Sequence, residues 1–136
     1  MPPPSPELIR GVPLFADLDD KTVAGLAGEF IERHFDDGTA IATEGVGGLN
    51  FFIVARGAAT VTVQGTKVGT LSEGDAFGEV ALVDKAARSA TVTADGPVVA
   101  YALPVWSFRP FVEQRPELAW KLLETLAERL RVAEAR

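Results

Sequence analysis

The chain has no cysteine and a single histidine, His34, among its 136 residues. Disulfides, thiolate metal sites and cysteine nucleophiles are therefore excluded, and so is any site that needs two imidazoles. Basic residues are scarce as well, because 13 Lys and Arg stand against 19 Asp and Glu, for a net charge of −6. Proteins that bind nucleic acid hold its phosphates with clustered basic side chains, so this balance indicates no nucleic-acid partner.

Long apolar runs are also missing. No run approaches the roughly 20 residues that span a bilayer, and the start MPPPSPELIR has no hydrophobic signal segment. These absences indicate a soluble, cytoplasmic protein with no membrane partner. With 47% hydrophobic and 24% charged residues, the chain has the composition of one folded domain, expected over residues 7–136 after a flexible proline-rich tail at residues 1–6.

Between residues 30 and 104, short extended runs alternate with turn signals. Runs such as FIERHF, NFFIVA and VVAYAL are separated by glycine and proline about every eight to ten residues. Two of the expected turns lie at residues 56–57 (RG) and 95–97 (DGP). The pattern predicts a mainly β fold, an antiparallel jelly-roll-like β-barrel with flanking helices at both ends of the chain.

The N-terminal helical segment precedes this barrel. Val23, Leu26 and Phe30 repeat at helical spacing, and Asp19 is a suitable N-cap before them. Gly25 and Gly28 each weaken such a helix by roughly 1 kcal/mol relative to alanine. We therefore expect tertiary contacts to support this helix.

The C-terminal helices are expected at about residues 105–136, and Pro116 suits the first position of the longer one. Trp106 and Trp120 are expected in the core or in a lid. The longer helix carries an apolar stripe at heptad spacing, which fits core packing and also leaves open a homodimer formed through this helix. The stripe consists of Ala119, Leu123, Leu126, Leu130 and Ala133.

One stretch of the barrel region, FGEVALVDKAARSATV at residues 77–92, does not fit the strand pattern. Its GEVALV part is short and apolar, and it is compatible with one helical turn. Free N–H groups at the start of such a turn, at Val80 and Ala81, would form an anion site. Gly78 would let a ligand approach the backbone closely.

Two charged residues of this stretch suggest what the anion is. Arg88 offers a planar, permanently charged fork that can bind two oxygens of one phosphate. Glu79 cannot bind the same anion, but its carboxylate is a strong acceptor for sugar hydroxyls. A phosphate with a ribose attached would satisfy both residues.

These residues resemble the phosphate-binding cassette F-G-E-x-A-L-x(5)-R-x-A-T of the cyclic nucleotide-binding domain family, which includes protein kinase A regulatory subunits, catabolite activator proteins and cyclic-nucleotide-gated channels. The resemblance extends over nearly the whole chain, from VPLFADL through the glycine-rich hairpin EGVGGLNFFIVARG to the last helix, which is similar to the family's lid helix. It implies reversible binding of a cyclic nucleotide, cAMP or cGMP, with no other cofactor. The ligand-binding residues that it implies are Phe77, Gly78, Glu79, Val80, Ala81, Arg88, Ser89 and Ala90.

The resemblance also implies individual roles. Glu79 would accept from the ribose 2′-hydroxyl, Arg88 would neutralise the cyclic phosphate, and Ser89 would place a hydroxyl near it. In the family, threonine directly after the arginine favours cGMP and alanine goes with cAMP; Ser89 lies between the two, and cAMP is favoured here. The chain departs from the family at Val46 and Leu49, where the hairpin usually carries two aspartates that do not contact the ligand.

These residues also have interpretations that involve no ligand. Glu79 and Arg88 could form a structural ion pair, although buried pairs stabilise poorly and the cassette around them is complete. His34 lies in an alternating strand and is expected on the solvent side. No metal site and no nucleophile–base pair is visible, so we expect no enzyme activity.

The chain ends directly after the last helix. We therefore expect the C-terminal helix to signal by its movement to an unidentified effector protein, or the chain to be the sensor of a larger assembly. The main alternative function is a ligand-free barrel that acts as a protein-interaction or dimerisation module. Binding of cAMP would distinguish the two.

Overall fold

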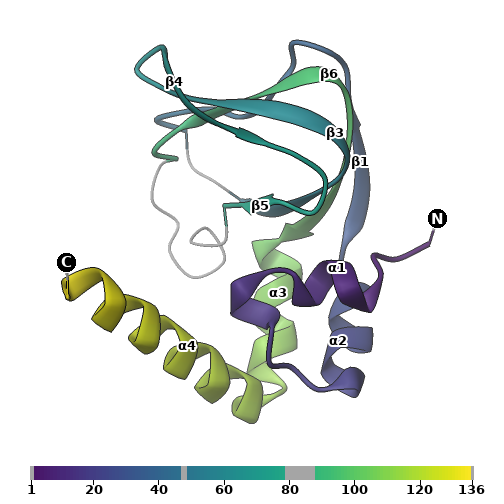
Figure 1. Ribbon diagram of the computed structural model, residues 1–136. Coiled ribbons are helices and arrows are strands. Elements are labelled where there is room, and N and C mark those ends of the chain that lie inside the picture. The colour runs from purple at the N-terminus through teal and green to yellow at the C-terminus, as the bar shows by residue number, and fades with distance from the viewer. Residues whose placement is uncertain (1, 47–48, 79–87, 136) are drawn as a thin grey trace.

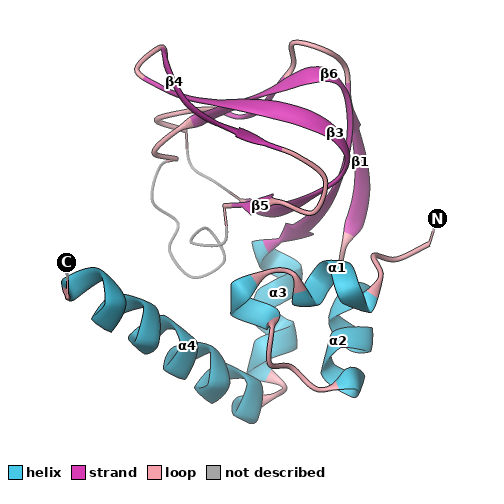
Figure 2. Ribbon diagram, viewed as in Figure 1, coloured by secondary structure: helices cyan, strands magenta, loops and turns pink. Residues whose placement is uncertain are grey.

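The computed structural model of the protein describes residues 2–46, 49–78 and 88–135. It places the strands in a curled sheet, with the helices gathered at one end of it (Figure 1). Figure 2 shows the same separation by element type. The elements, in chain order, are α1 (Pro6–Arg10), the 3-10 helix η1 (Pro13–Phe15), α2 (Asp20–Ala27), β1 (Ile31–Phe35), β2 (Ala40–Ala42), β3 (Asn50–Val63), β4 (Thr66–Leu71), β5 (Ala76–Phe77), β6 (Thr91–Pro104), α3 (Val105–Glu113) and α4 (Pro116–Glu134).

The described strands form one six-stranded antiparallel sheet. Its main order is β1-β6-β3-β4, while β2 also pairs with β6 and β5 also pairs with β3. The predicted jelly-roll-like fold with flanking helices is confirmed. Because β3 and β6 each pair with several other strands, these two long strands hold the barrel together.

The prediction of turns at residues 56–57 and 95–97 is wrong, because the chain forms β-bulges within strands there. Residues 56–57 lie inside β3 and residues 95–97 lie inside β6, so each pair of predicted short strands is one continuous strand of 14 residues. The β3–β6 register shifts on both sides of Arg56. Gly57 has φ +95°, and a Cβ there would lie 2.5 Å from the carbonyl oxygen of Pro97. Glycine here permits a close crossing that bends both strands, as bulges do in barrels.

Alternating side chains of β3 separate two apolar regions. Phe51 and Ile53 point into the main core, which the helices cover, whereas Phe52 points into the barrel interior. In the main core, Phe15 meets Phe51 edge to face, with ring centroids 5.9 Å apart. The helical end and the barrel are therefore packed as one body through strand β3.

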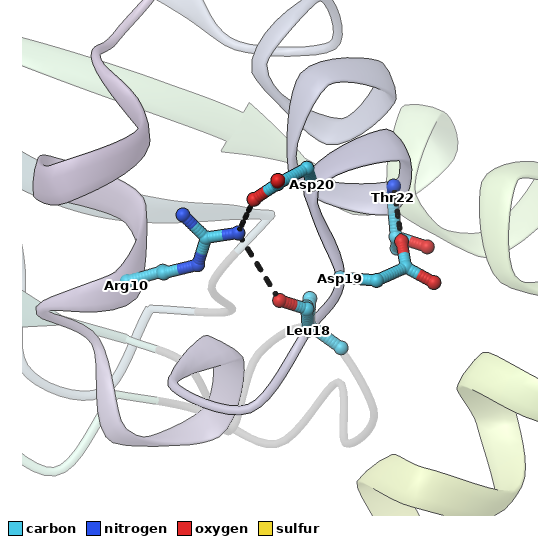
Figure 3. Close-up of polar contacts among 5 residues, drawn as sticks. All are labelled: Arg10, Leu18, Asp19, Asp20 and Thr22. Carbon is cyan, nitrogen blue, oxygen red and sulfur yellow. Dashed lines mark hydrogen bonds and ion pairs between the residues drawn. The ribbon is translucent and has the colours of Figure 1, made fainter.

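Polar contacts hold the N-terminal helices to one another (Figure 3). Arg10, at the end of α1, donates through Nη2 to the carboxylate of Asp20 and to the carbonyl of Leu18 at 3.3 Å. Asp19 is the N-cap of α2, as predicted, and accepts from the N–H of Thr22 at 2.7 Å. Hydrogen bonds from the Thr22 side chain and backbone lower the pKa of Asp19 from its usual value.

Helix α4 packs differently from the prediction. Among the described residues of this helix, Leu118 and Leu122 are buried and belong to the main core, and Leu126 packs against that core. Of the predicted stripe, Leu123 and Leu130 are 54% and 59% exposed. The heptad spacing identified an apolar face, but the surface that packs is turned toward residues 118 and 122, since η1 and α3 contact α4 from that side.

The two tryptophans are not core residues. Trp106 on α3 is 60% exposed and Trp120 on α4 is 66% exposed. They were expected in the core or in a lid, but the core positions of these helices are taken by Phe108, Phe111 and the two buried leucines of α4. None of the described helices is long and apolar enough to cross a membrane.

The glycines of α2 provide a matched test of this packing. Gly28 has right-handed helical φ and ψ at the C-cap, and the nearest atom to an added Cβ is 3.5 Å away. Gly28→Ala should therefore raise the free energy of unfolding by about 0.4–1 kcal/mol, because it restricts the unfolded chain. Gly25→Ala would press Cβ to 3.2 Å from the ring of Phe111, and overpacking of this kind costs about 1–3 kcal/mol.

Urea unfolding of the two variants and the wild type measures the difference. We expect Gly28→Ala to be more stable than the wild type and Gly25→Ala to be less stable than Gly28→Ala. Equal gains in both variants would show that α2 does not rely on its close contact with Phe111.

Candidate functional site

Arg88 is the charged centre of the predicted site, and it lies just before β6. Its backbone N–H donates to the carbonyl of Val46 at 2.9 Å, and its own carbonyl accepts from the N–H of Gly45 at 2.9 Å. The residue is thus bonded on both sides of its main chain to the segment that follows β2. This pairing sets the direction in which the side chain leaves the backbone.

The guanidinium of Arg88 reaches the start of β3. Its Nη2 donates to the main-chain carbonyl of Asn50, the first residue of that strand. Among the residues that the structure describes, no carboxylate forms an ion pair with it. A neutral carbonyl therefore orients the guanidinium, and its positive charge is not cancelled by any of these residues.

Gly78 lies directly against this guanidinium. Its φ is +84°, a left-handed conformation that favours glycine, and an added Cβ would lie 2.1 Å from Nη1 of Arg88. The carbonyl of Asn50 would be only 3.1 Å from the same Cβ. Glycine is required here for two reasons, the backbone conformation and the space that the arginine head occupies.

The electrostatics of Arg88 suit an anion. The residue is half-buried, and desolvation lowers the pKa of its guanidinium from the ordinary value. A cation that has lost part of its hydration is stabilised by an opposite charge within about 4–6 Å. Two N–H edges of a guanidinium can bind two oxygens of one phosphate, so the arrangement can hold a phosphate group.

The other predicted ligand residues fall into two groups. Phe77 lies in β5 and stacks on Phe52, with ring centroids 5.1 Å apart and planes at 22°, so its ring packs in the barrel interior. Ser89 is exposed and Ala90 is half-buried, both between Arg88 and β6. Glu79, Val80 and Ala81, with the helical turn predicted for them, lie outside the described residues.

Two further groups help to build the site and were not predicted as parts of it. Asn50 contributes its main-chain carbonyl to Arg88. Thr91, at the start of β6, accepts from the N–H of Glu44 at 3.0 Å through its hydroxyl. The threonine belongs to the cassette pattern, so its spacing was a usable signal. The role of Asn50 depends on the fold, which brings residues 50 and 88 together. No local sequence pattern predicts this contact.

His34 takes no part in this site. Its ring lies on the outer side of the barrel, and Nε2 is 2.8 Å from a carboxylate oxygen of Glu32. The side chain is 62% exposed, so the predicted solvent-side position is confirmed. Nearby, a groove between the N-terminal segment, the end of α2 and β1 is lined by residues that include Pro2, Phe30 and Tyr101, none of them from the cassette.

Known proteins that resemble this chain include cyclic nucleotide-binding proteins. Residues 32–115 match the family model of the cyclic nucleotide-binding domain. The cAMP-dependent protein kinase regulatory subunit of Yarrowia lipolytica is 42% identical over 88 residues, which cover 63% of this chain and 24% of that protein. The human potassium/sodium hyperpolarization-activated cyclic nucleotide-gated channel 2 is 31% identical over 121 residues, which cover 89% of this chain and 14% of the channel.

The fold has a close match among solved structures as well. The N-terminal domain of a transcriptional regulator from Streptomyces coelicolor superposes with a TM-score of 0.87 at 30% identity, covering 94% of this chain and 93% of that one. The chain spans only 14% to 24% of the two curated relatives named above. Their similarity to it therefore concerns one domain, and by the match of residues 32–115 this chain belongs to the cyclic nucleotide-binding domain family.

Proposed function

We propose that this domain binds cAMP reversibly through the cassette that includes Phe77, Gly78, Arg88, Ser89 and Ala90. The observation that carries the proposal is the half-buried guanidinium of Arg88, which a neutral carbonyl orients and which no described carboxylate neutralises. A regulatory subunit whose name includes cAMP dependence is 42% identical to this chain over 88 residues, which supports cAMP as the ligand. Arg88 would bind the cyclic phosphate.

The remaining parts of the nucleotide are assigned from the resemblance to the family. Glu79 would accept from the ribose 2′-hydroxyl, and the N–H groups of Val80 and Ala81 would bind phosphate oxygens. Ser89 is exposed next to Arg88, where it could contact the phosphate or the base. Serine keeps the hydroxyl through which threonine at this position favours cGMP in the family, so Ser89 lies between the two preferences. We favour cAMP over cGMP because a regulatory subunit named for its dependence on cAMP is 42% identical to this chain over 88 residues.

The domain would act as a regulator without catalysis of its own. Its output would pass from α4 to an effector protein, and the absence of any described membrane-spanning helix is compatible with our proposal of a cytoplasmic location. The exposed Leu123 and Leu130 favour a second candidate function, in which α4 forms a homodimer or docks on another protein. Calorimetry with cAMP distinguishes a ligand sensor from a ligand-free interaction module.

Arg88→Leu should bind cAMP at least about thirtyfold more weakly than the wild type in calorimetry. Removing one partner of a desolvated charge pair costs about 2–5 kcal/mol, which corresponds to that change or more. Arg56→Leu, which removes an exposed arginine from β3, serves as the control and should bind normally. Unchanged affinity in Arg88→Leu would remove phosphate recognition from this site.

Glu79 should determine the preference for a ribose 2′-hydroxyl. The wild type should bind cAMP more tightly than 2′-deoxy-cAMP, because a hydrogen bond to a charged acceptor contributes about 1.5–3 kcal/mol. Glu79→Gln keeps the size of the side chain but removes its charge, so most of this preference should disappear in competition binding. A preference that survives the substitution at full size would assign Glu79 a structural role.

Helix α4 should respond to the ligand through its C-terminal half. Truncation after Arg115 would remove Leu118 and Leu122 from the main core, so a chain shortened after Leu126 is the better test. This variant should stay folded and bind cAMP about tenfold more weakly, because it loses part of the helix proposed to cover the base; a tenfold loss corresponds to about 1.4 kcal/mol. Analytical ultracentrifugation of the same variant and the wild type tests whether α4 forms a homodimer.

The two readings of α4 give different outcomes in that variant. Weaker binding by a variant that keeps the oligomeric state of the wild type would support the lid. A dimeric wild type that becomes monomeric, with unchanged cAMP affinity, would support self-association and contradict the lid.

A further inference from the structure

The groove beside β1 is a cavity that the cassette does not use. Its sides are the N-terminal segment, the end of α2 and the start of β1. Its volume is about 460 Å³, which lies within the roughly 300–1,000 Å³ of most small-molecule sites. The groove is therefore large enough for a ligand of its own.

The β1–β6 register brings a carboxylate and an aromatic ring to one surface of this groove. Glu32 is the direct cross-strand partner of Tyr101. Ala100 and Ala102, on either side of Tyr101, belong to the barrel interior, so Tyr101 and its partner Glu32 lie on the outer face of the sheet. The ring of Tyr101 packs against the main core, and its hydroxyl donates to the carbonyl of Pro2 at 3.4 Å.

The proline-rich N-terminal segment forms the opposite side. Pro2 and Pro3 line the groove, and Pro4 is buried. The next residue, Ser5, caps α1 by accepting from the N–H of Leu8 at 3.2 Å. Because the prolines are held between this cap and Tyr101, they provide an apolar wall with little freedom in φ.

The charge of the groove is negative. Glu32 is the only charged residue among the described residues that line it. Its side chain is only 15% exposed, and one carboxylate oxygen lies 2.8 Å from Nε2 of His34. Ala27 and Gly28 bring the C-terminal end of α2 to the same groove, and the last turn of α2 contains no basic residue. A helix C-terminus carries partial negative charge, so both groups favour a cation.

We propose that this groove binds a cation carried on an apolar stem, that is, an alkylammonium or alkylguanidinium group. The stem would pack between the prolines and the ring of Phe30, and the cationic head would donate to the carboxylate of Glu32. A carboxylate with little access to water costs free energy unless it is paired, which is the reason for a charged head. A cyclic nucleotide is an anion and does not suit this groove, so the inference is independent of the proposed function.

The test titrates the full chain with hexylammonium, hexylguanidinium and neutral 1-hexanol and follows the backbone amides by NMR. Both cations should shift the amides of Gly28, Glu32 and Tyr101 in a saturable way. They should bind about fivefold or more tightly than hexanol, because only they bring a positive charge to Glu32. The amides of residues 88–92 should not shift, since Arg88 repels cations.

Glu32→Gln removes the charge but keeps an oxygen that can accept from His34, so this variant should remain folded, which thermal melting checks. It should lose most of the difference between the cations and hexanol. Glu73→Gln removes an exposed carboxylate between β4 and β5 and should bind as the wild type. The inference is overturned if neither cation shifts the groove amides, if hexanol binds as tightly as the cations, or if folded Glu32→Gln keeps the full preference.

The cationic group can come from a small amine or from a side chain of a partner protein. A peptide with one arginine between prolines separates these sources in the same titration. Tighter binding than hexylguanidinium at the same amides would assign the groove to a protein partner, and weaker binding would assign it to a small amine; each result supports the site. Binding of cAMP is measured separately by calorimetry, so a failure of the proposed function leaves this test intact.

Discussion

The antiparallel pairing of β3 with β6 is the constraint on which the rest of the structure depends. The two strands are 14 residues long and pair from Asn50 with Pro104 to Thr62 with Thr91. One end of this ladder leads into α3, and the other end begins at Thr91, the last residue of the cassette pattern. The same strands alternate between the helix-covered core and the barrel interior, so the pairing register decides which side chains are buried in each.

This ladder also explains how a charge is stabilised at the candidate site. Arg88 is far from Asn50 in sequence, and only the paired strands bring the guanidinium to the carbonyl that orients it. The left-handed conformation of Gly78 then leaves room for the arginine head. Among the described residues, only neutral groups hold this half-buried cation, and a charge that they leave uncancelled suits the recognition of a phosphate.

The helices at one end of the barrel show which features the apolar spacing of a sequence predicts and which it does not. The N-cap at Asp19 and the start of α4 at Pro116 were predicted correctly, because capping and the first helical turn depend on local chemistry. The packed face of α4 was predicted one position away from the buried Leu118 and Leu122. An amphipathic pattern defines a face of about 100° or more, and several neighbouring leucines satisfy it equally well. Contacts with η1 and α3 choose among them.

The sequence by itself determined the class of the fold and the order of helix, barrel and helices, and it predicted the cassette, because alternation, capping and the spacing of Gly78 and Arg88 are local properties of the chain. Only the tertiary structure decided that residues 56–57 and 95–97 are bulges, since glycine and proline occur in turns and bends alike and the crossing of Gly57 with Pro97 joins distant residues. It likewise decided that Asn50 supports Arg88. That contact uses a main-chain carbonyl, a group that every residue carries, so no side-chain pattern can reveal it before the strands are paired.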